Sequence, residues 1–422
     1  MTPTVGYTEM KDSGIHWMGT IPMHWDIQRA KFHFTQTNAR GNDNPILLAA
    51  SQKFGVCPQS WLEGVVQVSE NTDLQQFKTV HKNDFVISLR SFQGGFERSD
   101  FEGVCSPAYQ VFHADGSFDN DFLKYLFKNE LFIDEMNSLT VGIREGRNIK
   151  YDDFANSLIF IPPISEQSAI AAYLDSQCAK IDEIIAEAKA SIEDYKQWKA
   201  SIIYEAVTKG LDPKAEMKDS GIEWIGEIPK GWNIAKAGML FKEFIRPYCK
   251  GDKPLSLSQQ DGLVPTDEMK ESSLKTASYD NWKRVYLDDL VLNRFKAHLG
   301  VFFASRYVGC VSFHYGVYHA IRSDVVPKYY EYLFHSPHYK NLFAQLSNGI
   351  TVGLQNLSNR NFYSAYVHFP DYETQVEIVD FLEKKCSELE SLIVEKRLLI
   401  DDLEAYKKSL IYEVVTGKRR VC

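Results

Sequence analysis

Apolar residues recur at alternating spacings of four and three along residues 163–210, and this pattern predicts one long helix. Between Pro163 and Gly210 the sequence contains no other proline or glycine, so stop signals stand only at the two ends. A seam sustained over about four heptads is typical of a coiled coil. With Lys199 as an interruption, the seam positions are Leu174, Cys178, Ile181, Ile185, Ala188, Ile192, Tyr195 and Ile202.

Residues 370–417 repeat this pattern and predict a second long helix. Its seam has two interruptions, at Lys396 and Lys407. We expect the two seams to face each other in an antiparallel coiled coil. The apolar positions of the second seam are Leu382, Cys386, Leu389, Ile393, Ile400, Leu403 and Leu410.

The duplication extends over nearly the whole chain. Residues 10–27 match residues 217–234 at 12 of 18 positions, with an offset of 207. Shorter matches follow in the same order, and the segments YEAVT and YEVVT close the two helices. The chain is therefore two copies of one unit, each a globular domain followed by a helix.

Each globular segment mixes short strands with one amphipathic helix, so the predicted fold class is α+β. Runs of β-forming residues bounded by polar ones predict the strands. The predicted strands are 84–89, 109–112, 289–294 and 316–319, and the predicted helices are 122–130 and 329–335. We divide the chain into a first globular domain (1–162), a first long helix (163–210), a second globular domain (211–369), and a second long helix with the C-terminal tail (370–422).

The order of these parts implies a geometry. Only residues 212–216 separate the first helix from the second globular segment, so the first helix delivers the chain there directly. About 40 helical residues would span roughly 60 Å. If the second helix runs back along the first, two equivalent surfaces are held at a fixed separation about a pseudo-twofold axis, as DNA half-sites are.

Composition narrows the classes of partner. The 422 residues carry a net charge of −9, which argues against holding nucleic acid by bulk electrostatics, so any nucleic-acid surface must be local. Residues 161–216 contain six Lys or Arg against ten Asp or Glu. We expect the first helix to meet a protein partner rather than a phosphate backbone.

Neither a membrane segment nor a disulfide framework is expected. No apolar run approaches the length of a bilayer span, and the N-terminus lacks the features of a secretion signal, so we expect a cytoplasmic protein. The seven cysteines are an odd number without a CxxC pair, which favours reduced thiols.

A search for catalytic motifs finds none. Residues 161–164 resemble an amine-methylation motif only in their two prolines, because an isoleucine replaces the polar residue. There is no glycine-rich loop for a cofactor. His335 with His338, or His314 with His319, could be metal pairs, but packed or surface histidines are far commoner. We expect no enzymatic activity and no metal.

The repeated segment KDSGI-x-W-x-G-x-IP-x-x-W and the helix end SLIYEVVTGKRRV together resemble the specificity subunit of Type I restriction-modification systems. The resemblance covers both halves in the order recognition domain, spacer helix, recognition domain, spacer helix. It implies that each domain reads one half of a bipartite, asymmetric site in double-stranded DNA. It also implies that the helices set the length of the gap between the two halves of the DNA site and dock two modification subunits.

The same resemblance places the chemistry in other chains. S-adenosylmethionine would bind the modification subunits, and ATP with Mg would serve cleavage by restriction or motor subunits. No cofactor is expected in this chain. For docking and the coiled coil we assign the seam residues Leu174, Ile181, Ile185, Ile192, Tyr195, Ile202, Leu382, Leu389, Ile393, Ile400, Leu403 and Leu410.

Candidate DNA contacts lie in three pairs of loops. Amide, guanidinium and imidazole side chains after a strand suit the readout of base edges. The first domain contributes Gln52, Lys53, Arg90, Ser91, Gln93, Arg144, Arg147 and Asn148. The second contributes Gln259, Gln260, Arg294, Lys296, His298, Gln355, Asn356 and Asn359.

Each assignment has a structural alternative. The loop residues could be solvated turns, and those near residues 140–148 and 351–359 could stabilise a hairpin. Trp17, Trp25, Trp224 and Trp232 are better explained as packing residues than as DNA contacts. For the whole chain, the alternatives are a structural coiled-coil scaffold and a stand-alone methyltransferase or nuclease, which the missing motifs disfavour.

Overall fold

A computed structural model describes residues 6–41, 46–62, 74–89, 91–139, 149–259, 262–269, 279, 281–347 and 356–421. The chain divides into two compact units. Unit 1 comprises Met1–Ala188 with Leu398–Cys422, and unit 2 comprises Lys189–Arg397. Both division points fall inside the long helices α5 (Ile164–Lys209) and α10 (Tyr372–Val415), so each unit contains part of both.

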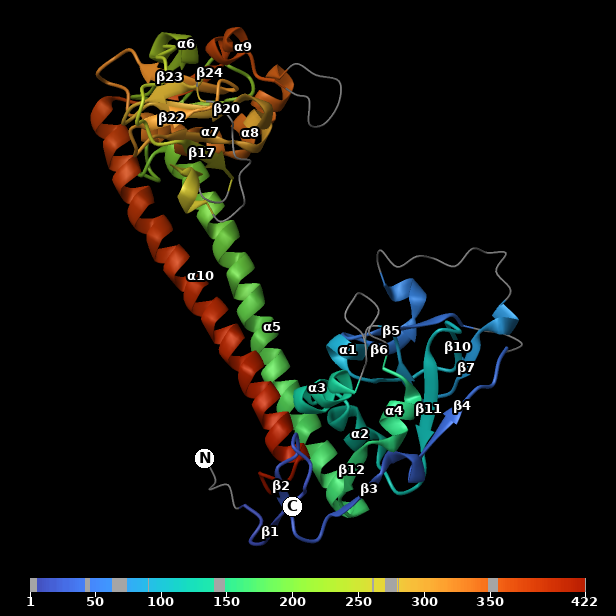
Figure 1. Ribbon diagram of the computed structural model, residues 1–422. Helices are drawn as coiled ribbons and strands as arrows, with labels where there is room; N and C mark the ends of the chain where they lie inside the picture. Colours follow the sequence, from blue (N-terminus) through green and yellow to red (C-terminus); the bar gives the residue numbers. More distant parts are fainter. Residues whose placement is uncertain are drawn as a thin grey trace. The chain divides into compact units, whose positions relative to one another are not determined.

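Unit 1 contains a four-stranded antiparallel sheet in the order β4-β11-β8-β9, with two-stranded pairs beside it (Figure 1). Its strands are β1 (Met10–Asp12), β2 (Thr20–Pro22), β3 (Asp26–Arg29), β4 (Phe34–Thr37), β5 (Leu48–Ser51), β6 (Gly55–Pro58), β7 (Lys78–Val80), β8 (Phe85–Ile87), β9 (Glu97–Arg98), β10 (Gly103–Cys105), β11 (Gln110–Ala114) and β12 (Leu158–Ile161). Its short helices are α1 (Ser91–Gly94), α2 (Asn120–Leu126), α3 (Glu130–Ser138) and α4 (Tyr151–Asn156).

Unit 2 repeats this arrangement with a four-stranded antiparallel sheet in the order β16-β23-β20-β21. Its strands are β13 (Met217–Asp219), β14 (Glu227–Pro229), β15 (Asn233–Lys236), β16 (Phe241–Glu243), β17 (Leu255–Ser258), β18 (Gly262–Pro265), β19 (Lys283–Val285), β20 (Leu290–Asn293), β21 (Phe302–Ala304), β22 (Gly309–Val311), β23 (Tyr315–Ala320) and β24 (Tyr366–Phe369). Its short helices are α6 (Ala237–Leu240), the 3-10 helix η5 (Arg294–Leu299), α7 (Pro327–His335), α8 (Pro337–Leu346) and α9 (Asn359–Ser364).

The two sheets share their turn chemistry. Asn83 and Asp288, just before β8 and β20, both have positive φ, at 70° and 64°. In each turn the next residue is a buried aspartate that accepts a backbone N–H: His81 N donates to Asp84, and Tyr286 N donates to Asp289, both at 2.8 Å. The duplication read from the sequence is therefore a structural duplication.

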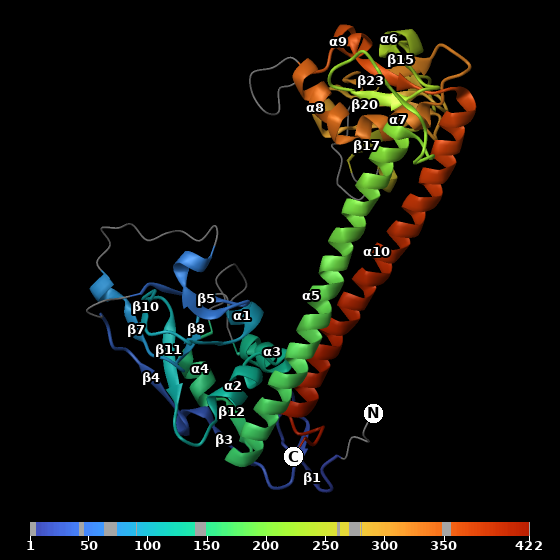
Figure 2. The same cartoon turned by 180° about the vertical axis from the view of Figure 1, so that it is seen from behind.

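The long predicted helices are both present, and they pack against each other within each unit. Figure 2 shows them side by side from behind, as Figure 1 does from the front. Lys407 donates to Asp182 at 2.7 Å in unit 1, and Lys199 donates to Glu390 at 2.5 Å in unit 2. The earlier of the two α5 residues, Asp182, pairs with the later of the two α10 residues, Lys407. The helices are therefore antiparallel, as predicted.

The seam residues lie inside this helix pair. Leu174, Ile181 and Leu389, for example, are at most 6% exposed. Most of the other seam residues are buried as well, whereas Tyr195, Ile202 and Leu403 are only partly buried. Any protein that docks on the outside of the helices must contact other residues.

The tryptophans of the repeated N-terminal segment pack inside their units, as predicted. In unit 1, Trp25 is fully buried and stacks on Phe160, with ring centroids 5.3 Å apart. Gly417, just past the end of α10, lies so close that an added Cβ would be 2.9 Å from the Trp25 ring. In unit 2, Trp232 meets Gly210 after α5 in the same way, at 3.3 Å.

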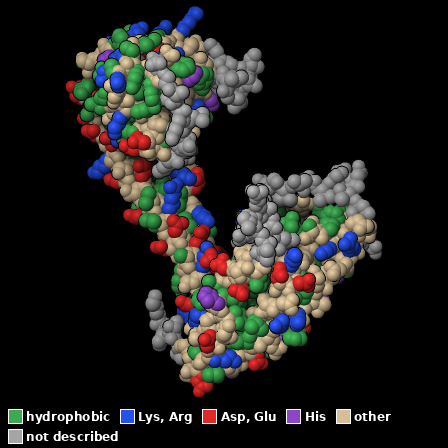
Figure 3. Space-filling view, viewed as in Figure 1, with side chains coloured by type: hydrophobic (Ala, Val, Ile, Leu, Met, Phe, Trp, Pro, Cys, Tyr) green, Lys and Arg blue, Asp and Glu red, His purple; other side chains and the backbone are tan. Residues whose placement is uncertain are grey.

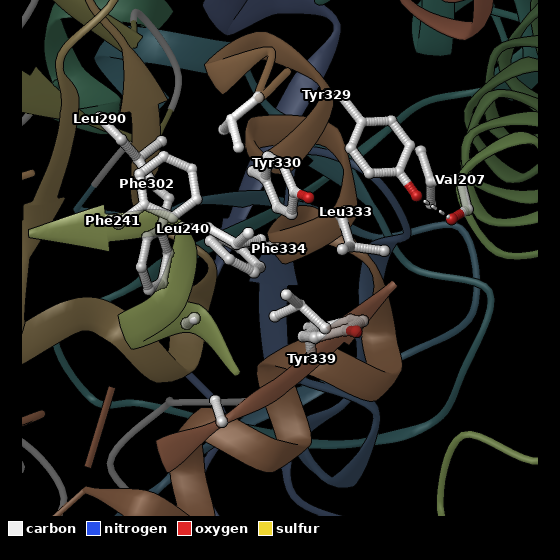
Figure 4. Close-up of a cluster of buried hydrophobic side chains, with 14 of the residues drawn as sticks. Val207, Leu240, Phe241, Leu290, Phe302, Tyr329, Tyr330, Leu333, Phe334 and Tyr339 are labelled. Atoms are coloured by element: carbon white, nitrogen blue, oxygen red, sulfur yellow. Dashed lines mark hydrogen bonds between the residues drawn. The ribbon is translucent and has the colours of Figure 1, made fainter. Parts of the chain in front are cut away.

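The main core of unit 2 joins the sheet, α7, α8 and the end of α5 (Figure 4). Tyr329 lies fully buried on α7, and its hydroxyl donates to the backbone oxygen of Val207 at 2.8 Å. Tyr330, Phe334 and Tyr339 continue this core from α7 into α8. Aromatic packing thus anchors the domain to the helix that precedes it in the chain.

One prediction about the short helices was wrong. The segment expected to be a single helix at 122–130 is divided, because Asn129 caps a new helix, α3, by accepting the N–H of Leu131 at 2.9 Å. In unit 2, Pro337 begins α8 directly after α7 in the same way. Each unit therefore has two helices where one was expected.

Candidate nucleic-acid interface

In unit 1, two of the predicted DNA-contact segments lie against each other. Gln52 occupies the turn between β5 and β6, and α1 follows β8. A Cβ added at Gly94 in α1 would lie only 2.5 Å from Cγ of Gln52. The hairpin turn and the glycine-bearing loop thus form one continuous surface.

The corresponding segments of unit 2 also meet. The side-chain amide of Gln259, at the β17–β18 turn, donates to the backbone oxygen of Leu299 at 3.2 Å. Lys296 lies exposed on the same 3-10 helix, and His298 is half-buried there. Both units therefore place a glutamine turn beside the loop that follows the central strand, and different side chains line the two surfaces.

Exposed aromatic side chains extend the unit 1 surface, and the sequence analysis missed them. Phe54 and Trp61 are 43% and 54% exposed, and their rings stand edge to face at 6.1 Å. The Lys53 ammonium lies 4.8 Å from the Phe54 ring centroid. The available signal was an aromatic residue next to Gln52 and Lys53 in an otherwise polar turn.

Arg294 and Asn359 have protein partners inside unit 2. Both donate to Oε2 of Glu243, Arg294 at 2.7 Å and Asn359 at 2.5 Å. Lys283 donates to Oε1 of the same carboxylate at 2.8 Å, and the hydroxyl of Tyr318 donates to Asn359 at 2.8 Å. Their DNA contacts stay a prediction, but both side chains have a structural role.

The charge state of Glu243 follows from this network. Burial opposes ionisation of Glu243, but hydrogen bonds from Asn359 and Lys283 and the charge of Arg294 outweigh it and hold the pKa of Glu243 below its usual range. In unit 1 the corresponding strand position carries Gln36. Its side-chain Nε2 donates to Oε1 of Gln110 at 3.4 Å. The two units therefore support similar backbones with charged and neutral networks respectively.

The remaining candidates differ in accessibility. Ser91 is buried, and its hydroxyl accepts the N–H of Ser88 at 2.8 Å, so it orders the start of α1. Asn356 is exposed. Outside the described residues, or with side chains that are not described, lie Arg90, Gln93, Arg144, Arg147, Asn148, Gln260 and Gln355.

Charge is mixed over the visible surface, with acidic and basic side chains interspersed along the helices in Figure 3. Among the described residues, no cluster of three or more His, Cys, Asp or Glu side chains has the arrangement of a metal site. No helix in the described part of the chain is long and apolar enough to cross a membrane.

Comparison with known proteins gives one family match. The model for the Type I restriction modification DNA specificity domain matches residues 30–194. The Type I restriction enzyme EcoKI specificity subunit of Escherichia coli strain K12 is 24% identical over 304 residues. That alignment covers 67% of this chain and 61% of the E. coli subunit, less than two thirds of its length.

Solved structures share the fold over almost the whole chain. A chain from a type I R-M system, described for complex assembly and conformational transition, matches with a TM-score of 0.67 at 14% identity. The HsdS subunit of Thermoanaerobacter tengcongensis matches with a TM-score of 0.55, also at 14% identity. Each alignment covers 94% of this chain and 98% of the other.

Proposed function

Because this chain belongs to the specificity-subunit family of Type I restriction-modification systems, we propose that it recognises DNA sequence for an assembly whose other subunits carry out the chemistry. Methylation with S-adenosylmethionine, and cleavage with ATP and Mg, belong in this proposal to modification and restriction subunits. The assembly acts in the cytoplasm.

Each unit reads one half of a bipartite site. The observation that carries this proposal is the repeated placement of a glutamine turn against the loop that follows the central strand, at Gln52 with Gly94 and at Gln259 with Leu299. The scaffold is duplicated, but its polar side chains differ between the two units. Unlike two identical readers, such units suit an asymmetric site, because side chains on base edges determine sequence preference.

The helices set the gap between the half-sites and dock the modification subunits. Exposed apolar residues occur on them in matching places. Trp198 and Tyr406, 208 residues apart in the sequence, are 54% and 51% exposed, and each precedes a lysine of an interhelical ion pair. Ile184 and Leu392 have the same offset and are 44% and 38% exposed. One patch in each unit supports one copy of the same partner per unit, and exposed aromatics commonly dominate binding energy.

Selection from a random DNA pool tests the reading function. The complex of this chain with its modification subunits should enrich one sequence with two defined segments separated by a fixed gap. Enrichment of no sequence would favour the coiled-coil scaffold instead. Methyl transfer by the isolated chain would favour the stand-alone methyltransferase.

Docking is tested by the subunit count of the complex. Trp198→Ala and Tyr406→Ala should each weaken the binding of one modification subunit about thirtyfold or more. The reason is that a hot-spot residue contributes at least about 2 kcal/mol to the binding free energy. Native mass spectrometry near the dissociation constant should then show complexes with one modification subunit. Gln197→Ala changes an exposed neighbour of Trp198 and should keep two. Two bound subunits in all three variants would exclude the proposed patches.

A further inference from the structure

A groove in unit 2, with a cavity volume of about 890 Å³, is lined by residues of α5, η5, α7, α8 and α10, among them the carboxylates Glu331, Glu383 and Glu390. Gln259 and Leu299 line it, so it borders the glutamine turn described above. Its remaining polar wall includes Lys340, Ser336 and His335. Burial, followed by the charges of Lys340 and Lys328, lowers the pKa of His335 to about 3, so that ring is neutral at pH 7.

Lys340 differs from the other cations of the groove. Four of them have carboxylate partners, in the pairs Lys196–Glu193, Lys199–Glu390, Arg306–Glu383 and Lys328–Glu331. Lys340 has no such partner among the described residues. Burial also lowers its pKa, because the ammonium has lost water without gaining an anion.

Ser336 supplies a second unsatisfied group at the same place. It is the N-cap residue of α8, but its side chain accepts no helical N–H. The residue is 2% exposed, and within the described part of the chain its hydroxyl has no hydrogen-bond partner. A helix N-terminus carries partial positive charge, so an uncapped one with a free hydroxyl is suited to an anion.

In unit 1 the positions that correspond to Ser336 and Lys340 carry different residues. Asn129 stands at the N-cap of α3, and its side chain accepts the N–H of Leu131 at 2.9 Å. Ile133 stands where unit 2 has Lys340, since a Cβ at Gly95 would lie 3.3 Å from its Cγ1. In unit 2 a Cβ at Gly300 would lie 2.5 Å from Cε of Lys340. Oδ1 of Asn129 thus caps its helix while Nδ2 of the same side chain is buried without a partner among the described residues, as the Ser336 hydroxyl is. What the repeat exchanges is a capped helix and an aliphatic side chain in unit 1 for an uncapped helix and, within the described ranges, an unpaired lysine in unit 2.

We propose that Ser336, Lys340 and the N-terminus of α8 bind one phosphate of the DNA backbone, in unit 2 only. The ammonium and the hydroxyl both donate to phosphate oxygens. This contact fixes the register of the duplex beside Gln259, since phosphate contacts position a protein on DNA without reading its sequence. The inference rests on the proposed function and adds to it a contact absent from unit 1.

The salt dependence of DNA binding by the complex with modification subunits tests this contact. Lys340→Ile installs the residue that unit 1 carries. Loss of one phosphate contact should reduce the slope of log K against log salt by about 0.9. Binding should weaken by the same factor on cognate and on non-cognate DNA. Lys230→Gln removes one charge from an exposed pair with Glu216 and should leave the slope unchanged. An unchanged slope in Lys340→Ile would overturn the proposal.

A second variant guards against misfolding. Ser336→Asn should cap α8 as Asn129 caps α3, so it should keep or raise the melting temperature while it weakens DNA binding. Tight DNA binding with a normal slope in this folded variant would contradict the proposal.

Inorganic phosphate distinguishes a free-anion site from a DNA contact. In one outcome, phosphate raises the melting temperature of the wild type but not of Lys340→Ile, and the salt dependence of DNA binding has the same slope in both proteins. The groove would then bind free phosphate, and the DNA contact would be refuted. Absence of sequence preference in the wild-type complex would contradict the proposed function instead, and the slopes would still decide the phosphate contact.

Discussion

Lys199 on α5 donates to Glu390 on α10 at 2.5 Å, and the lysine is 29% exposed. The other interhelical ion pair lies at the positions related by an offset of 208. Lys407 on α10 corresponds to Lys199, Asp182 on α5 corresponds to Glu390, and Lys407 donates to Asp182 at 2.7 Å. Two of the three lysines that interrupt the apolar seams, Lys199 and Lys407, therefore hold matching ion pairs. A charged residue within a coiled-coil seam specifies register at some cost in stability.

A double-mutant cycle measures this pairing. Lys199→Glu and Glu390→Lys should each lower the free energy of unfolding, and the double variant should recover most of the loss. The coupling should be about 0.5 kcal/mol, because both side chains are partly solvated, and it should shrink at high salt. The Asp182 and Lys407 cycle serves as the internal replicate. Zero coupling in both cycles at low salt would show that the pairs do not define register.

Glu243 is predicted to stabilise unit 2 through its buried charge network. Glu243→Gln leaves Lys283 and Arg294 without their carboxylate, and removal of one partner of a buried pair costs about 3 kcal/mol. The denaturant midpoint of unit 2 should fall accordingly. Gln36→Ala, at the corresponding neutral position of unit 1, is the control and should cost less. Equal losses would contradict the special role of the charge.

Acid should destabilise unit 2 through this same carboxylate. The pKa of Glu243 is held below its usual range, so its contribution is present above the unfolded value near 4.5 and disappears as pH falls through the lower folded value. In Glu243→Gln, the stability of unit 2 should therefore depend less on pH below 4.5 than in the wild type.

A second acid effect is predicted for His368, at a higher pH. Burial lowers its pKa to about 4, and its Nδ1 lies 3.0 Å from the hydroxyl of Tyr339. Between pH 4 and the unfolded pKa near 6.5 the unfolded chain binds more protons, so stability falls as pH falls through this window. Unit 1 has Phe132 and Phe160 at the corresponding places.

Replacing Tyr339 and His368 together by phenylalanine copies unit 1 and should make the fall in melting temperature between pH 6.5 and 4 shallower. His335, whose pKa is also lowered by burial, should keep the rest of the fall. Each variant is compared with its own value at pH 7.5, so that any change in packing cancels. An equally steep fall in the double variant would assign the acid effect to other groups.

The gap between half-sites should follow helix length. Removing one matched heptad from α5 and α10 keeps both seams in phase and shortens each helix by roughly 10 Å. The methylated sequence should keep both segments and lose bases between them. A change in the segments themselves would contradict a spacing role for the helices.

The long helices could be predicted because their signal is local and periodic. The residues that end each helix and those that form its buried face all lie within the helix sequence itself, as Leu174 and Ile181 do. The sheet of each unit was predicted only in part, since strands of two to six residues carry weak patterns. The division at Asn129 was missed because a short helix cap has the same composition as a surface turn.

The candidate site was predictable to the level of segments. The sequence placed Gln52 and Gln259 in equivalent turns, and the structure brings each turn against the predicted loop. It did not indicate that Arg294 and Asn359 share the carboxylate of Glu243, because that residue is 51 and 116 positions away. Long-range pairing of this kind depends on how the strands are placed, which no local pattern encodes.

The most direct measurement compares the methylated sites of two cell lines by sequencing. One line carries this chain with its modification subunits, and the other carries the same chain with residues 28–160 replaced by the domain of another family member. The account predicts that one half of the methylated sequence changes while the other half and the gap stay the same. A change in both halves, or in neither, would contradict two independent readers in one chain.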